Sequence, residues 1–77
     1  MDDMKIIGEN IRRLRKTRGM TQSQLAVALG ISVATLSSYE CGKTTPSMDS
    51  ILQMSRYFKT SVDEILKQPE AKDTFDN

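Results

Sequence analysis

The residue types on which enzyme chemistry most often relies are scarce in this 77-residue chain. There is no histidine and a single cysteine, which excludes an internal disulfide, a histidine-based metal site and an imidazole general base. Asp63 and Glu64 are adjacent carboxylates, but their place after Ser61 is typical of a helix cap. No glycine-rich phosphate loop is present. We therefore expect no enzymatic activity, no metal site and no cofactor.

The chemistry that remains is the binding of a polyanion, because charge is unevenly distributed along the chain. The net charge is only +1, yet residues 10–43 carry six basic side chains and one acidic side chain. The basic ones are Arg12, Arg13, Arg15, Lys16, Arg18 and Lys43. Residues 46–77 carry four basic and six acidic side chains. Such a polarised molecule can offer DNA its positive side, although a solvated basic helix face is a common alternative.

Residues 21–42 have the pattern of two short helices joined by a tight turn. Thr21 and Gln24 have the spacing of a capping box. Gly30 can adopt the left-handed conformation that ends a helix, and Ser32 can cap the next helix. The inward apolar positions are Leu25, Leu29, Ile31, Leu36 and Tyr39, with Ala26 small enough for a close crossing. This is the order of parts in a DNA-binding helix-turn-helix.

Periodicity predicts three more helices and hence an all-α fold. The stripe of Ile7, Ile11 and Leu14 predicts a first helix over about residues 6–17. The second and third helices are expected over 22–29 and 33–41, and Ser47 and Ser61 are expected to cap the fourth and fifth. We expect one compact five-helix domain over residues 6–66, between a flexible arm at 1–5 and a polar tail at 67–77. We expect no membrane span and no signal peptide.

The helix-turn-helix segment resembles the phage-repressor family (Cro-like, lambda-repressor-like or XRE-type). The family's Thr-Gln, Leu-Ala, Gly and closing Glu-x-Gly are matched by Thr21-Gln22, Leu25-Ala26, Gly30 and Glu40-Cys41-Gly42. The resemblance covers about residues 6–66. It implies a cytoplasmic, repressor-like transcriptional regulator that binds double-stranded DNA as a homodimer and reads the major groove with its third helix.

The resemblance also implies which residues face the bases. The family contacts bases with the first two helical positions and the sixth, which are Val33, Ala34 and Ser38 here; the apolar stripe places Ser37 on the same outer face. Val33 and Ala34 can pack on thymine methyl groups, while the serines bond to several bases with low selectivity. We therefore expect modest direct readout, with DNA shape supplying part of the specificity. The plainer alternative is a helix with no DNA target.

Four further residues are expected at phosphates. Gln22 opens the second helix, where the resemblance implies that its amide donates to a phosphate oxygen; a plain surface glutamine is the alternative. Thr35 near the start of the third helix is a similar candidate. Lys43 and Thr44 follow the third helix, where the family loop approaches the DNA backbone. The resemblance also pairs Arg15 with Glu40, in an ion pair that would hold the third helix against the first.

A second functional hypothesis is a protein-interaction module, such as an antitoxin-like protein that binds a partner and has weak or secondary DNA binding. The small side chains of the third helix and the acidic C-terminal half favour it. A dependence of duplex binding on salt would separate the two hypotheses. For the dimer interface, the candidates are Tyr57, Leu66 and Phe75.

Overall fold

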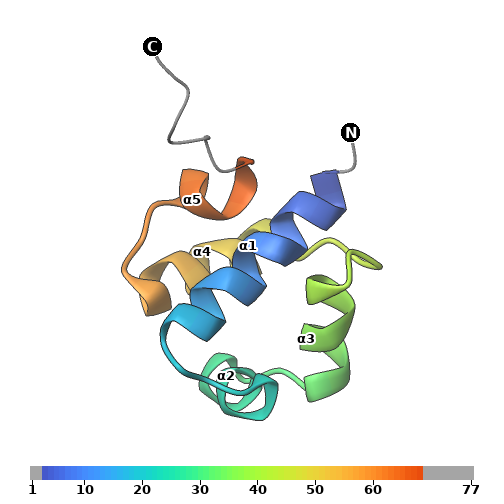
Figure 1. Ribbon diagram of the computed structural model, residues 1–77, viewed down its shortest axis with the longest axis vertical. Coiled ribbons are helices and arrows are strands. Elements are labelled where there is room, and N and C mark those ends of the chain that lie inside the picture. Colours follow the sequence, from blue (N-terminus) through green and yellow to red (C-terminus); the bar gives the residue numbers. More distant parts are fainter. Residues whose placement is uncertain (1–2, 69–77) are drawn as a thin grey trace.

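The computed structural model describes residues 3–68, which form five α-helices and, within this range, no strand (Figure 1). The helices are α1 Asp3–Thr17, α2 Gln22–Leu29, α3 Val33–Glu40, α4 Met48–Phe58 and α5 Val62–Leu66. The predicted all-α class is confirmed. The candidate interface residue Phe75 and the predicted tail from residue 69 onward lie outside the described range.

Two helix boundaries differ from the predictions. α1 begins at Asp3 rather than Ile6, so residues 3–5 belong to the helix and not to an arm. The apolar stripe could not locate this start because residues 3–5 are exposed and add no buried apolar side chain. α3 ends at Glu40, and Cys41 forms its C-cap, donating its N–H to the carbonyl of Ser37. The one-residue difference at the end of α3 is ordinary at helix ends.

The helix starts follow from their caps. Thr21 and Gln24 form the full capping box: the Thr21 hydroxyl accepts from the Gln24 N–H at 3.1 Å, and the Gln24 side chain accepts from the Thr21 N–H at 2.9 Å. Ser32 accepts from the N–H of Thr35 at 3.0 Å. Gly30 ends α2 with a φ of 71°, the left-handed conformation that glycine adopts without strain. The turn between α2 and α3 is thereby fixed by local chemistry.

The hydrophobic core lies where the five helices meet. α1 runs across the molecule in front of α4, with α2 and α5 at opposite ends and α3 to one side (Figure 1). Each helix contributes a fully or almost fully buried apolar side chain: Ile11, Leu25, Leu36, Phe58 and Ile65. The α2–α3 pair is therefore packed against the rest of the domain through Leu25 and Leu36.

α1 and α3 cross unusually closely at Gly8. A methyl group at this position would overlap the carbonyl oxygen of Tyr39 and lie 2.8 Å from that of Glu40. Glycine is needed here for space, since the backbone of α3 occupies the volume that a Cβ atom would fill. This contact sets the distance between α3 and α1.

Candidate nucleic-acid interface

The N-terminal end of α3 is at the surface. Val33 is 42% exposed and Ala34 is exposed, whereas Leu36 on the opposite side of the helix is completely buried. Ser37 and Ser38 are half-buried on the same helix. The structure thus brings the four expected base-contacting residues together on one short helix, with its first turn the most accessible part. Val33 and Ala34 are thus accessible at the surface without any rearrangement of the core.

Three of the four expected phosphate-contacting residues lie at the two ends of the helix pair, and Thr35 lies between them in the first turn of α3. Lys43 and Thr44 are exposed in the turn that follows α3, and the N–H of Lys43 donates to the Ser38 carbonyl at 2.9 Å. Thr35 is half-buried, and its hydroxyl accepts from the Ser32 hydroxyl at 2.9 Å. Gln22 is half-buried at the first position of α2. Helix starts and the loops beside them are common sites of phosphate binding.

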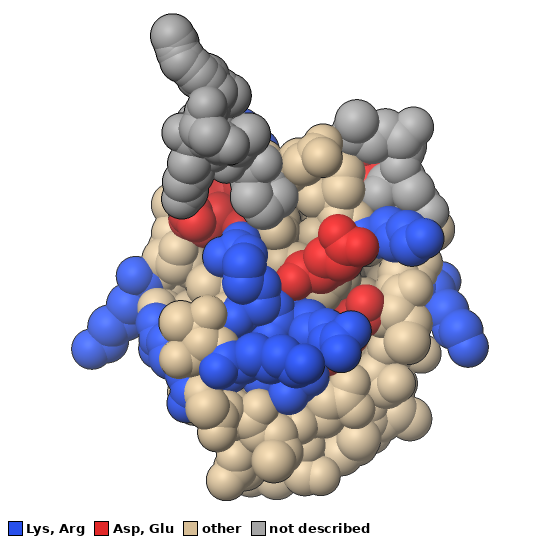
Figure 2. Space-filling view, in the orientation of Figure 1, with Lys and Arg blue, Asp and Glu red and all other residues tan. Residues whose placement is uncertain are grey.

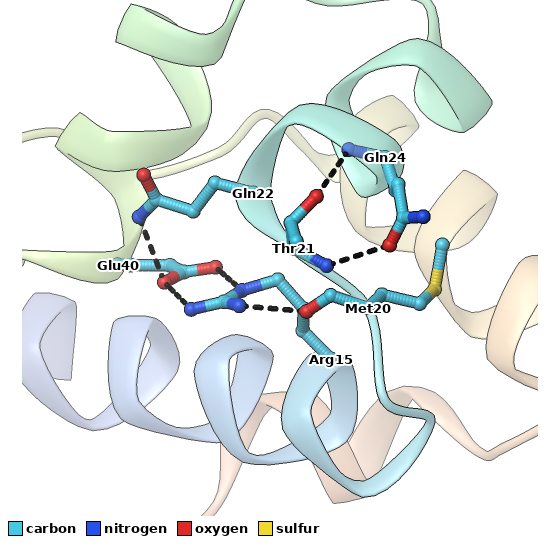
Figure 3. Close-up of polar contacts among 6 residues, drawn as sticks. All are labelled: Arg15, Met20, Thr21, Gln22, Gln24 and Glu40. Atoms are coloured by element: carbon cyan, nitrogen blue, oxygen red, sulfur yellow. Dashed lines mark hydrogen bonds and ion pairs between the residues drawn. The ribbon is translucent and has the colours of Figure 1, made fainter.

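A buried ion pair joins α1 to the end of α3. The Nε atom of Arg15 lies 2.7 Å from Oε2 of Glu40, and Nη2 donates to Oε1 at 3.0 Å (Figure 3). Both residues are only 8% exposed. The hydrogen bond to Glu40 raises the pKa of Arg15, and burial acts in the opposite direction. This two-point geometry fixes the carboxylate in both position and orientation.

The pair has two further partners that sequence reasoning missed. Arg15 donates through Nη1 to the carbonyl of Met20 at 2.8 Å, and Gln22 donates through Nε2 to Oε1 of Glu40 at 3.1 Å (Figure 3). The network therefore spans α1, the α1–α2 turn, α2 and α3. The capping box at Thr21 fixes the start of α2 beside it. The sequence places Gln22 directly after the Thr21 cap, at the start of α2. It does not indicate in which direction the Gln22 amide points.

The basic residues of α1 and of the turn that follows it have different surroundings. Arg18 donates to the carbonyl of Phe58, and its guanidinium lies 5.3 Å from the centre of that ring. Arg13 donates to the side chain of Asn10 at 3.2 Å. Arg12 and Lys16 are exposed. Basic side chains gather over α1 in Figure 2, with acidic ones beside them. Part of the predicted basic surface thus serves the packing of α1.

Asn10 is a buried polar residue that the sequence did not single out. Its amide nitrogen donates to the carbonyls of Ile65 and Lys67, at 2.8 and 2.7 Å. These bonds satisfy carbonyls at the end of α5, where a helix leaves such groups without internal partners. Asn10 therefore ties α5 to α1.

Residues 3–68 contain no group of acidic or cysteine side chains arranged to hold a metal ion. Among the same residues, no helix is both long and apolar enough to cross a membrane.

Comparisons with known proteins agree on one family. A family model described as helix-turn-helix (HTH_3) matches residues 11–65. The chain is 40% identical over 63 residues to the uncharacterized HTH-type transcriptional regulator YazB of Bacillus subtilis, covering 82% of this chain and 91% of YazB. It is 37% identical over 62 residues to the HTH-type transcriptional activator BcrR of Enterococcus faecalis, covering 80% of this chain. That match spans only 30% of the length of BcrR.

A phage protein and two solved structures are also similar. The chain is 32% identical over 59 residues to the cryptic phage CTXphi transcriptional repressor RstR of Vibrio cholerae, covering 77% of this chain and 53% of RstR. The restriction-modification controller protein C.AhdI from Aeromonas hydrophila superimposes with a TM-score of 0.77 at 25% identity, covering 84% of this chain and 98% of that one. A transcriptional regulator from Listeria innocua gives 0.73 at 30% identity, covering 87% and 64%.

The matched segment includes all of α2, α3 and α4, the second half of α1 and nearly all of α5, and it accounts for most of the chain. The fold and the sequence comparisons therefore agree with the resemblance noted in the sequence, and the chain belongs to the Cro/XRE-like helix-turn-helix family.

Proposed function

We propose that this protein is a transcriptional regulator that binds double-stranded DNA sequence-specifically, with α3 in the major groove. The observation that carries this proposal is the exposed first turn of α3, held on a rigid framework by the buried Leu36 and by Glu40. A helix of this kind fits the major groove of B-DNA without distortion of the protein. Family membership supports the same function.

In the proposed complex, Val33 and Ala34 pack against thymine methyl groups, and Ser37 and Ser38 bond to base edges. Gln22, Thr35, Lys43 and Thr44 contact phosphates and so set the position of α3 on the duplex. Because none of the four base-facing side chains can form a bidentate base contact, DNA shape and deformability supply part of the specificity. The protein acts on its DNA in the cytoplasm.

The proposed functional unit is a homodimer on a pseudo-palindromic operator. A single module of this size covers little DNA, and two-fold pairing is how helix-turn-helix proteins gain affinity. Tyr57, which is 39% exposed, and the half-buried Leu66 are the described candidates for the interface. Among the relatives, BcrR is named an activator and RstR a repressor; repressor-like action remains our prediction for this chain.

Selection from a random duplex library tests the proposal. We expect the protein to enrich an inverted repeat and to bind it with an affinity that falls steeply as salt increases, because bound phosphates release counterions. A library that stays random, together with a salt slope near zero, would contradict the proposal and favour the protein-interaction alternative.

A further inference from the structure

The carboxylate of Glu40 serves two partners on two different helices. Its Oε2 atom accepts from Nε of Arg15 at 2.7 Å, while Oε1 accepts from Nη2 of Arg15 at 3.0 Å and from Nε2 of Gln22 at 3.1 Å. Figure 3 shows the Gln22 amide nitrogen turned toward Glu40 and its oxygen turned away. Arg15 alone already bonds to both carboxylate oxygens of Glu40. The additional bond from Gln22 therefore needs a separate explanation.

The chemistry of the amide provides one. A primary amide carries two N–H groups, and the bond to Glu40 uses one of them. The remaining N–H on the same nitrogen is then held in a fixed direction by a charge-assisted bond. Gln22 is the first residue of α2 and is half-buried, so this donor lies at a helix start, where anions bind. The positive charge of Arg15 offsets the repulsion that the Glu40 carboxylate alone would exert on a phosphate.

We propose that Glu40 is a positioning residue for the phosphate contact of Gln22. This inference rests on the proposed DNA binding and adds a second role to the buried ion pair. Arg15 fixes the carboxylate, the carboxylate fixes the amide, and the amide offers its second N–H to a phosphate oxygen. A free glutamine side chain would have to be ordered during binding, at an affinity cost of about 2- to 12-fold. The network also links the phosphate contact of α2 to the end of α3.

A double-mutant cycle tests the link. The four proteins are the wild type, Gln22→Ala, Glu40→Asp and the double variant. The probe is a fluorescent duplex obtained by selection with the wild type. Aspartate keeps the negative charge beside Arg15 but withdraws its oxygens from Gln22 by one methylene group. We expect each single change to weaken binding about 3- to 10-fold, and the double variant to lose clearly less affinity than the product of the two single fold-losses. Fold-losses that multiply would overturn the proposal.

A matched glutamine serves as the control. Gln53 on α4 donates to the carbonyl of Leu29 at 3.1 Å, a bond of the same length outside the network. Gln53→Ala combined with Glu40→Asp is expected to give fold-losses that multiply. If the wild type binds no duplex, the proposed function fails. If it binds and the losses of Gln22→Ala and Glu40→Asp multiply, only the positioning role fails.

A second measurement needs neither DNA nor a folded variant. In the free wild type, the Nε2 protons of Gln22 should exchange with water more slowly than those of Gln24, whose side chain uses its oxygen rather than its nitrogen in the capping box. Proton-exchange NMR of the side-chain amides reports both rates. Slower exchange at Gln22 supports the proposal, and equal rates would overturn it.

Discussion

At the scale of single residues, the feature with the largest energetic consequence is the buried pair of Arg15 and Glu40. Its side chains are 10% and 3% exposed, whereas those of the Lys67–Asp63 pair are 70% and 69% exposed. A buried pair is not strongly stabilising in itself, but loss of one partner leaves an uncompensated buried charge. Loss of Glu40 should therefore destabilise the protein much more than loss of Asp63, because Lys67 stays in water without its partner.

Replacing Glu40 by alanine should lower the free energy of unfolding by about 3 kcal/mol, because the Arg15 guanidinium would remain buried without a carboxylate. Urea denaturation measures the loss. Asp63→Ala is the matched control and should change stability by less than about 1 kcal/mol, since its partner stays in water. Equal losses in the two variants would show that the Glu40 pair is effectively a surface pair.

The raised pKa of Arg15 gives the pair a defined dependence on pH. Because the pKa is higher in the folded protein, the stability contributed by Arg15 is complete at every pH below the ordinary arginine value. It is lost only as the pH rises through the folded value. We therefore expect the contribution of Arg15 to the free energy of unfolding to stay constant from neutral pH to about pH 10. Urea denaturation of the wild type and of Glu40→Ala at several pH values measures this contribution as the difference between the two proteins.

Lys43 is the basic side chain that we most expect to meet a phosphate. Lys43→Ala should weaken binding about equally for all duplex sequences and should reduce the slope of log affinity against log salt by about one unit. Fluorescence titrations at several salt concentrations give this slope. Lys67→Ala removes the same charge at the end of α5 and should leave the slope unchanged. A changed slope in the control alone would place the DNA on a different face.

At the scale of helices, the distance between α1 and α3 depends on Gly8. Their backbones are so close that the Tyr39 and Glu40 carbonyls occupy the space of a side chain at this position. This distance also brings Arg15 within reach of Glu40. The close approach at Gly8 and the ion pair of Arg15 and Glu40 both hold α3 against α1.

Gly8→Ala should destabilise the domain by about 1–3 kcal/mol, because the added methyl group forces the two helices apart. In an exposed helix the same change would instead stabilise by about 1 kcal/mol. Thermal unfolding, monitored by circular dichroism, shows whether the substitution lowers or raises the stability. Ser23→Ala, on the exposed side of α2, is the control and should have little effect. A stabilised Gly8→Ala variant would contradict the close crossing.

The helices show which features could be predicted from the sequence. The caps at Thr21, Ser32, Ser47 and Ser61 and the glycine stop at Gly30 act between residues that are close in sequence, so the starts of α2 to α5 could be predicted. The roles of Gly8 and Asn10 could not, because their partners are 31 or more residues away and depend on how whole helices pack. The pairing of Arg15 with Glu40 came from the family resemblance. The bonds from Arg15 to the Met20 carbonyl and from Gln22 to Glu40 required the three-dimensional structure.

At the scale of the whole molecule, the features that bear on function are the exposed tip of α3 and the proposed two-fold pairing. In the proposed complex, one exposed helix turn with small side chains would make few base contacts, so a single domain would have limited affinity and selectivity. Two domains related by a two-fold axis would read two half-sites. The small number of base contacts expected from one short helix is thus the reason that we propose a two-fold complex with DNA.

The proposed dimer predicts a spacing between half-sites. Selected duplexes should contain inverted half-sites about 10–10.5 base pairs apart, centre to centre, which is one turn of B-DNA. Insertion of about 5 base pairs between them should reduce affinity to that for one half-site, because the second α3 would then face the wrong side of the duplex. Gel-shift assays with both duplexes test this. Equal affinity for the two spacings would contradict a rigid dimer.

The central claim is that the first turn of α3 enters the major groove, and NMR titration tests it most directly. The ¹⁵N-labelled protein is titrated at low salt with a selected duplex while its backbone amides are followed. We predict that the largest shifts occur at Val33, Ala34 and Ser38, with smaller ones at Gln22 and Lys43 and almost none in α5. Unmoved α3 signals, with shifts confined to another face, would contradict this account.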